Sequence, residues 1–148
     1  MEKFDQRYLE MAEIWARNSY CKRRQVGAIL VKDRMIISDG YNGTPSGFEN
    51  VCEDENGATK PYVLHAEANA IISAARSDTI DATIYLACHD AKTGELYGDV
   101  EPCAMCKRMI INAGISTVII RNTHDKYTTI NVQSWIEHDD SLEGTDGY

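Results

Sequence analysis

Two β-rich runs lie so close together in this sequence that they constrain the fold more than any other feature. Residues 26–31 and residues 35–41 are separated only by Lys32, Asp33 and Arg34. Three polar residues leave room for a tight turn and nothing more, so the two runs predict an antiparallel β-hairpin. A sheet that contains this hairpin cannot be entirely parallel.

The rest of the chain alternates between helical and extended patterns. Phe4, Tyr8, Met11 and Trp15 recur at helical spacing and predict an amphipathic helix over about residues 4–19. Farther along, the patterns predict helices over residues 66–76 and about 103–113, strands over residues 83–87 and 116–120, and one or two helical turns over residues 132–136.

The order of these elements predicts the fold class. A helix, a hairpin, a helix, a strand, a helix and a strand favour an α/β fold whose mixed sheet is covered by helices on both faces. Gly114 is expected to end the helix over residues 103–113 as its C-cap. Residues 42–64 and 89–101 lack a sustained apolar period, and loops of such length in a small domain are usually functional.

The composition is that of a globular domain. The 148 residues are 43% hydrophobic and 26% charged, so we expect a single domain over residues 1–148. The net charge is −8, with an acidic tail over about residues 137–148. This charge repels phosphate backbones and disfavours nucleic acid as a partner. The chain shows neither a membrane-spanning run nor a signal-peptide core, which predicts a cytoplasmic protein with no membrane partner.

Cysteine usage points to thiols or metal ligands. The chain has five cysteines, at positions 21, 52, 88, 103 and 106, and an odd number without dense spacing does not form a disulfide framework. We therefore expect reduced thiols, some of which bind metal.

Two short motifs place metal-binding residue types at the start of predicted helices. One is His65-Ala66-Glu67 and the other is Pro102-Cys103-Ala-Met-Cys106. Proline is tolerated in a first helical turn, and the two sulfurs share one helix face because they are three residues apart. The helix dipole predicts thiol pKa values below the ordinary range. Together with His65 they make three ligands, one fewer than a closed structural zinc site, which predicts a catalytic zinc with a position open for water.

Glu67 is the predicted general acid and base. Zinc lowers the pKa of bound water from about 15.7 to about 7 and so supplies hydroxide at neutral pH. From the first turn of its helix, Glu67 can point toward that water.

Two other interpretations of the cysteines remain. In the first, Cys88, Cys52 or His89 supplies a fourth ligand and the zinc is a structural staple. In the second, Cys103 and Cys106 form a thioredoxin-like redox pair, which leaves the His-x-Glu motif unexplained.

At these motifs the sequence resembles a known family. The His-x-Glu and Pro-Cys-x-x-Cys stretches match the signature of zinc deaminases. With Cys21-Lys-Arg-Arg-Gln-Val-Gly-Ala28, Gly40-Tyr-Asn-Gly-Thr-Pro-Ser-Gly47 and His65-Ala-Glu-Ala-Asn-Ala-Ile71, the chain resembles the deoxycytidylate (dCMP) deaminases of the cytidine deaminase-like superfamily. The resemblance covers residues 21 to about 120 and implies a three-layer α/β/α fold with a five-stranded mixed sheet.

The resemblance also implies a reaction. Zinc-bound hydroxide attacks C4 of cytosine, while Glu67 protonates N3 and then carries a proton to the departing ammonia, so that dCMP becomes dUMP for thymidylate synthesis. Asn42 is implied near the sugar, with a purely local role in its turn as the alternative. Ala66 and Glu101 complete the expected substrate-binding residues.

A monophosphate substrate requires cations. Arg24 is the first choice and Arg23 the second, whereas Lys22, Lys107 and Arg108 are as well explained by a solvated surface. Two charge-assisted hydrogen bonds, at about 1.5–3 kcal/mol each, favour the nucleotide over the nucleoside by roughly 10²–10⁴.

Further expectations rest on the resemblance alone. Family members imply a homo-oligomer, with a hexamer favoured, and regulation by dCTP and dTTP, the nucleotide effector binding with Mg²⁺. Some relatives carry a second metal near the positions of Cys21 and Cys52, but two buried free thiols are the favoured interpretation here. Residues 89–101 form an insertion, since family members pass almost directly from the third strand into the Pro-Cys motif.

Three rival functions share parts of this pattern. A tRNA adenosine deaminase has both motifs and acts on a flipped base. A free cytidine deaminase would show no selectivity for the 5′-phosphate. A non-catalytic, zinc-stapled binding module would hold metal without turnover.

Overall fold

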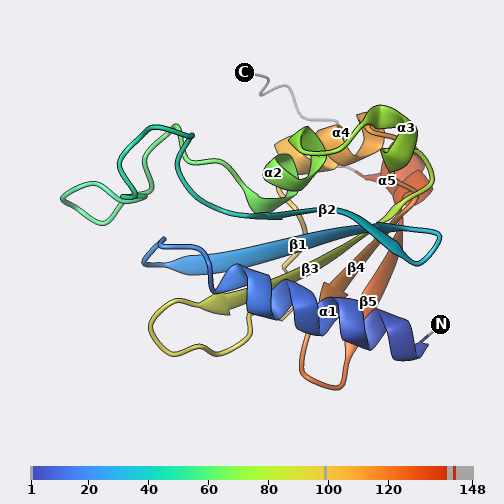
Figure 1. The fold of residues 1–148 in the computed structure, drawn as a ribbon, viewed down its shortest axis with the longest axis horizontal. Coiled ribbons are helices and arrows are strands. Elements are labelled where there is room, and N and C mark those ends of the chain that lie inside the picture. Colours follow the sequence, from blue (N-terminus) through green and yellow to red (C-terminus); the bar gives the residue numbers. More distant parts are fainter. Residues whose placement is uncertain (1, 99, 140–141, 143–148) are drawn as a thin grey trace.

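The computed structural model describes residues 2–98, 100–139 and 142. Its elements, in chain order, are α1 (Glu2–Ala16), β1 (Arg24–Lys32), β2 (Met35–Tyr41), α2 (Ala66–Ile72), α3 (Arg76–Thr79), β3 (Thr83–Asp90), α4 (Ala104–Asn112), β4 (Thr117–Arg121), β5 (Tyr127–Asn131) and α5 (Val132–His138). The strands form one five-stranded sheet in the order β2-β1-β3-β4-β5 (Figure 1). Only β3 and β4, which α4 joins, are parallel, so the predicted mixed sheet is confirmed.

The hairpin between β1 and β2 has the turn that the sequence predicts. Asp33 and Arg34 have φ angles of 52° and 62°, the left-handed conformation that two-residue hairpin loops require. The pairing register runs outward from Lys32 opposite Met35, and it shifts once between Leu30 and Val31.

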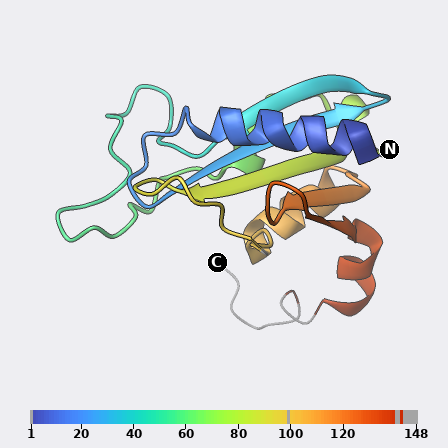
Figure 2. The same ribbon diagram turned by 90° about the horizontal axis from the view of Figure 1, so that it is seen from below.

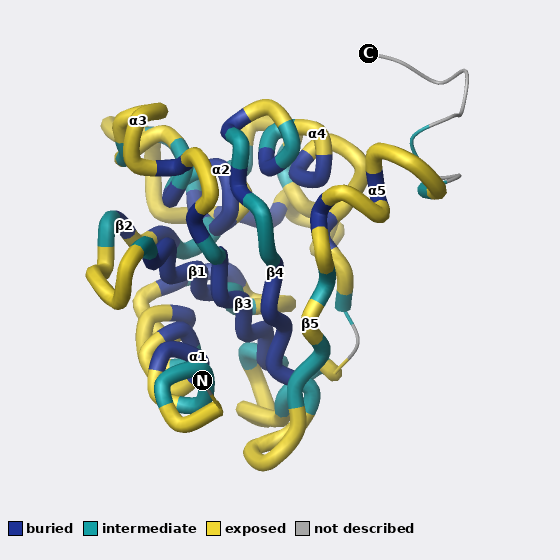
Figure 3. Tube along the Cα trace, turned by 90° about the vertical axis from the view of Figure 1, so that its right-hand side faces the viewer, coloured by how far each residue is buried: buried dark blue, intermediate teal, exposed yellow. Residues whose placement is uncertain are grey.

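Helices cover both faces of the sheet and make three layers. Helix α1 lies alone on one face, while α2, α3, α4 and α5 lie on the other (Figures 1 and 2). Successive side chains of β1 face opposite helical layers, because side chains alternate along a strand. Ile29 belongs to the buried cluster that contains Leu9 of α1, and Leu30 belongs to the cluster on the other face, which contains Ile110 of α4. The buried residues therefore run through the centre of the sheet, between the two helical layers (Figure 3).

Two glycines let the helices approach the sheet closely. A Cβ atom on Gly27 would lie 2.0 Å from the carbonyl oxygen of Ala12 in α1. A Cβ atom on Gly40 would lie 2.4 Å from the carbonyl oxygen of Ala66, the first residue of α2. Real Cβ contacts are never this short, so these positions require glycine, and Gly40 sets how closely the start of α2 sits on β2.

The structure differs from the sequence prediction at several boundaries. The helix predicted over residues 66–76 ends at Ile72 and continues as the short α3, and α1 ends at Ala16. Strand β3 runs on to Asp90, where pairing with β1 extends it. Strand β5 is an edge strand of half-exposed residues, and it escaped periodicity analysis because Ile130 is its only aliphatic side chain. The C-cap of α4 is Ala113, one residue before the predicted Gly114, which follows it with a φ of 81° and turns the chain away from the helix.

Cys21 and Cys52 do not match the expected buried free thiols. Their sulfurs form a disulfide, which joins the segment before β1 to the loop over residues 42–64. The two sulfurs and a carboxylate oxygen of Glu53 lie within 4.8 Å of one another, so these residues group as the predicted second metal site only when the disulfide is reduced. Sequence spacing missed the pair because 31 residues separate its members and only the fold brings them together.

Two other expectations concern membrane-spanning segments and the acidic tail. No helix among the described residues is both long and apolar enough to cross a membrane. Most of the acidic tail predicted over about residues 137–148 lies outside the described residues.

Candidate active site

Two helix starts on the same side of the sheet supply the predicted metal ligands. His65 directly precedes α2 and Cys103 directly precedes α4, and each has an extended backbone that ends where its helix begins. Cys106 lies one turn into α4 and is 2% exposed. Helices α2 and α4 contact each other, so their N-terminal residues converge.

The three predicted ligands lie at the spacing of a metal site. His65 Nδ1 is 3.3 Å from Cys106 Sγ and 3.5 Å from Cys103 Sγ, and all three atoms lie within 4.8 Å of one another. Tetrahedral zinc, with bonds of about 2.3 Å to sulfur and about 2.0–2.1 Å to nitrogen, separates such donors by about 3.6 Å. The donor set and its spacing therefore fit a zinc ion.

The thiol of Cys106 does not have the lowered pKa that the helix dipole predicts. Burial raises its pKa far above the usual range, and the neighbouring Glu67 and Cys103 raise it further. Loss of solvation and two adjacent acidic groups outweigh the dipole of one short helix. A cation between the sulfurs is what favours their thiolate forms.

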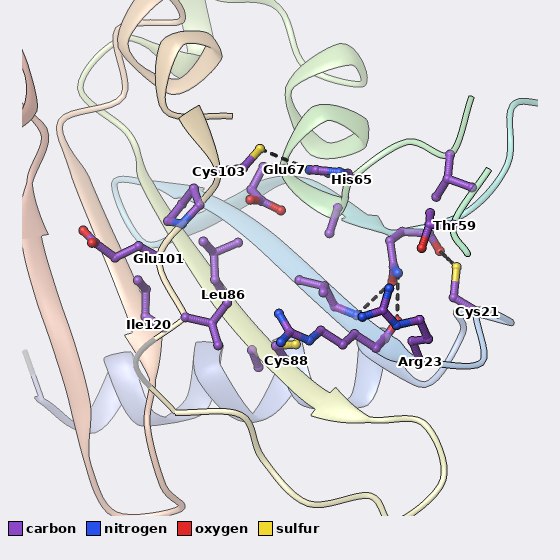
Figure 4. Close-up of a pocket in the computed structure, with 18 of the residues that line it drawn as sticks. Cys21, Arg23, Thr59, His65, Glu67, Leu86, Cys88, Glu101, Cys103 and Ile120 are labelled. Atoms are coloured by element: carbon purple, nitrogen blue, oxygen red, sulfur yellow. Dashed lines mark hydrogen bonds between the residues drawn. The ribbon is translucent and has the colours of Figure 1, made fainter. Parts of the chain in front are cut away.

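Glu67 lies beside this cluster. Its side chain is only 6% exposed and lines the same pocket as His65 and Cys103. The carboxylate lies next to both residues in Figure 4. A buried carboxylate at the edge of a metal cluster is placed to exchange protons with a reacting group.

The alternative ligand sets are not assembled. Among the described residues, the donor group around His65 contains Cys103 and Cys106 and no further histidine, cysteine or acidic side chain. Cys52 is in the disulfide, and His89 Nε2 is bonded to Gln25 Oε1 at 2.6 Å. Cys88 lines the pocket, where burial raises its pKa to about 11, so that it stays a neutral thiol at pH 7. Cys103 and Cys106 are both free rather than paired as a redox disulfide.

A pocket of about 360 Å³ opens in front of the cluster. All five predicted substrate-binding residues line it: Arg23, Arg24, Asn42, Ala66 and Glu101. Leu86 and Ile120 supply apolar wall between the arginines and the metal ligands (Figure 4). The pocket therefore has a metal-binding end, an apolar middle and a cationic end.

The lesser phosphate candidates lie elsewhere. Lys107 is buried, and its ammonium lies 2.6 Å from Asp139 Oδ2. Arg108 is exposed on α4 and, like Lys22, is not among the residues that line the pocket around the cluster. Of the five predicted cations, only Arg23 and Arg24 line this pocket.

Asn42 has a structural role in addition to its place in the pocket wall. Its Oδ1 accepts from the N–H of Val26 at 2.8 Å, and its Nδ2 donates to the carbonyl of Arg24 at 2.9 Å. The amide thus fixes the backbone that carries Arg24. One amide hydrogen and one lone pair are left for another contact.

Sequence reasoning missed two residues near the cationic end: Glu53, which lines this pocket, and Tyr97, which lines a second pocket that Arg23, Arg24 and Glu53 also line. Glu53 is buried, and its Oε2 accepts from the backbone N–H of Lys22 at 2.9 Å. Tyr97 lies under the guanidinium of Arg24, at 4.5 Å from the ring centroid. Neither Glu53 nor Tyr97 belongs to a motif, so the only sequence feature that pointed to them was the length of the segments over residues 42–64 and 89–101.

Comparison with known proteins agrees with this site. Residues 2–122 match the model for the cytidine and deoxycytidylate deaminase zinc-binding region. A deoxycytidylate deaminase of Mycobacterium phage D29 is 34% identical over 130 residues, which cover 78% of this chain and 92% of the relative. The human deoxycytidylate deaminase is 32% identical, over 81% of this chain and 64% of its own length. For the Schizosaccharomyces pombe enzyme, at 31% identity, the chain spans only 41% of the relative.

Solved structures extend the comparison to the fold. The dCMP deaminase of cyanophage S-TIM5, in complex with dCMP and dUMP, is 36% identical with a TM-score of 0.71, covering 97% of this chain and 92% of that one. A cytidine deaminase from Burkholderia pseudomallei, at 23% identity and a TM-score of 0.57, covering 86% of this chain and 93% of that one, shares the fold. A family model that matches most of the chain, together with these relatives, places this protein in the zinc-dependent cytidine and deoxycytidylate deaminase family.

Proposed function

We propose that this protein hydrolyses dCMP to dUMP and ammonia. One observation carries the proposal: a single pocket is lined by His65, Cys103 and Glu67 at one end and by Arg23 and Arg24 at the other, and the buried Cys106 completes the ligand group with His65 and Cys103. The first end suits deamination and the second suits a 5′-phosphate. The relatives named deoxycytidylate deaminase and the S-TIM5 complex with dCMP and dUMP support the same substrate.

His65, Cys103 and Cys106 would hold the zinc ion. When bound, zinc acts as a Lewis acid that lowers the pKa of water to about 7. The three side chains supply one nitrogen and two sulfur donors, the set expected of a zinc site that leaves one position open.

Glu67 would carry the protons. As water adds to C4 of the cytosine ring, the carboxylate takes one proton from the water and delivers it to N3. The second proton of the water then passes through Glu67 to the exocyclic nitrogen, the C4–N4 bond breaks, and ammonia leaves a uracil ring. Because Glu67 is buried and lies beside the ligands, its carboxylate can carry out both proton transfers without a relay through bulk water.

The rest of the pocket would orient the nucleotide. Leu86 and Ile120 would exclude water from the base, and the free lone pair or hydrogen of Asn42 would contact the sugar. Ala66 and Glu101 would form the wall next to the base. Arg24, with Arg23 second, would bind the 5′-phosphate through charge-assisted hydrogen bonds.

Assaying four substrates separates this function from its rivals. Purified protein loaded with zinc should release ammonia from dCMP faster than from deoxycytidine, by roughly 10²–10⁴ in kcat/KM. It should leave the adenosine of a tRNA anticodon stem-loop unchanged. The rate on CMP, compared with that on dCMP, measures the preference for deoxyribose. Equal rates on dCMP and deoxycytidine would indicate a cytidine deaminase, whereas bound zinc without any turnover would indicate a binding module.

The family resemblance extends the proposal beyond the single site. The chain would act as a homo-oligomer, with a hexamer favoured, in the cytoplasm, and its dUMP would feed thymidylate synthesis. Activation by dCTP with Mg²⁺ and inhibition by dTTP would regulate it. Light scattering of the purified protein and dCMP assays with each nucleotide test these extensions.

A further inference from the structure

The insertion over residues 89–101 builds a hairpin at the end of β3. The N–H of Asp90 donates to the carbonyl of Glu95 at 2.8 Å, and the N–H of Tyr97 donates to the carbonyl of Cys88 at 2.8 Å. Gly94 makes the turn with a φ of 75°. The returning strand therefore places Tyr97 directly opposite Cys88, whose side chain lines the pocket.

Arg24 reaches the same place from the other side of β3. In the sheet register Arg24 pairs with Asp90 and Val26 pairs with Cys88. The side chains of Arg24, Asp90, Cys88 and Tyr97 thus share one face of three adjacent strands. The guanidinium of Arg24 crosses β3 and lies over the Tyr97 ring, with 4.5 Å between the guanidinium carbon and the ring centroid.

Asp90 holds the tyrosine in turn. Its Oδ2 accepts from the Tyr97 hydroxyl at 3.1 Å, and its Oδ1 accepts from the N–H groups of Lys92 and Thr93 at 2.8 and 3.0 Å. These hydrogen bonds lower the pKa of Asp90, so the anchor is a carboxylate at neutral pH. The ring is fixed from both its backbone and its hydroxyl.

Stacking has a direct consequence for binding. A guanidinium held over the face of an aromatic ring by its charge still has N–H groups to donate to the oxygens of a phosphate. An arginine that is already ordered also loses less conformational freedom when the phosphate arrives. Arg24 and Cys88 both line the pocket at the metal ligands.

We propose that Tyr97 is a positioning residue that holds Arg24 for the 5′-phosphate, so that the 89–101 insertion sets the preference for nucleotide over nucleoside. The proposal rests on the proposed function, since it assigns a substrate group to that same pocket. Tyr97 itself touches neither the base nor the reacting atoms. Its effect is on affinity for the phosphate through Arg24.

The test compares Tyr97→Leu, which removes the ring, with Tyr97→Phe, which removes only the hydroxyl. We expect Tyr97→Leu to raise KM for dCMP about tenfold with kcat within about twofold, and to leave kcat/KM for deoxycytidine unchanged. Tyr97→Phe keeps the ring and should stay within about threefold of the parent. In an Arg24→Ala background, Tyr97→Leu should add nothing further.

A matched control and a binding measurement complete the design. Tyr62 also lies under a cation, Lys60 at 5.8 Å, yet it lines neither the pocket at the metal ligands nor the second pocket, which Tyr97 lines with Arg24, so Tyr62→Leu should leave dCMP kinetics unchanged. Calorimetric titration with dUMP reports affinity without turnover. Weaker dUMP binding by Tyr97→Leu supports the inference even if the protein fails to deaminate dCMP, a result that would refute only the proposed function. Unchanged dUMP affinity, or equal losses on dCMP and deoxycytidine, would overturn the inference.

Discussion

His65 Nδ1 lies 3.3 Å from Cys106 Sγ, although 41 residues separate them in the chain. The contact depends on how α2 and α4 are seated on the sheet, because each residue lies at the start of one of these helices. Gly40 allows the first residue of α2 to lie against β2, and α2 in turn contacts α4. The metal cluster is therefore a product of packing, and small shifts of either helix would separate its donors.

Metal content tests the cluster directly. Wild-type protein should bind one zinc ion per chain, and a strong chelator should abolish deamination until zinc is restored, because three donors supply the site. His65→Ala should lose the metal in elemental analysis by mass spectrometry. His124→Ala, at a side chain that is 78% exposed, is the matched control and should retain it. Full activity in metal-free protein would contradict the assignment.

Substitution of Glu67 separates proton transfer from metal binding. Glu67→Gln keeps the size of the side chain but cannot carry a proton, so kcat should fall by about 10²–10⁴ while zinc content stays at one per chain. Glu101→Gln alters an exposed carboxylate of the same pocket and should have a much smaller effect on kcat. Steady-state ammonia release measures both variants. Near-normal turnover by Glu67→Gln would remove it from the mechanism.

The sequence predicted the elements that carry the cluster better than it predicted the pocket around it. The hairpin, α4 and the two metal motifs follow from local periodicity and spacing, which tertiary contacts do not change. The disulfide between Cys21 and Cys52 joins residues 31 apart, and no local pattern indicates such a pairing. The position of Tyr97 could not be predicted either, since its place under Arg24 depends on a hairpin whose strands are too short to show a period.

The close packing of α1 on β1 can be tested by adding a single Cβ atom at Gly27. Gly27→Ala adds a Cβ that would lie 2.0 Å from the carbonyl oxygen of Ala12, so α1 must move, at a cost of about 3 kcal/mol in the free energy of unfolding. Gly47→Ala is the control, because its Cβ meets nothing within 4 Å and only its φ of 92° is unfavourable. That strain costs about 1–2 kcal/mol. Urea unfolding measures both, and equal losses would show that α1 tolerates the extra atom.

The buried thiol of Cys88 should make stability depend on pH. Its pKa is raised from 9.0 to about 11 by burial, with Glu67 and Asp90 adding to the rise and Arg24 opposing it. A pKa raised in the folded state favours the protonated form, so its contribution is complete below pH 9 and is lost as the pH rises to about 11. Between pH 8.5 and 11, the free energy of unfolding should therefore fall by about 2–3 kcal/mol more in the parent protein than in Cys88→Ala. Parallel pH curves for the two proteins would show that the thiol does not titrate in this range.

Substitution of Arg24 tests the phosphate end of the pocket. Arg24→Ala should raise KM for dCMP by about 10- to 150-fold, the loss expected for one hydrogen bond between charged groups, because it removes a guanidinium that lines the pocket. Turnover of deoxycytidine, which has no phosphate, should change by less than about twofold. Arg108→Ala, on the exposed face of α4, is the matched control and should leave both substrates unaffected. If dCMP and deoxycytidine suffer equally from Arg24→Ala, the guanidinium supports the pocket wall and the nucleotide preference must come from Arg23.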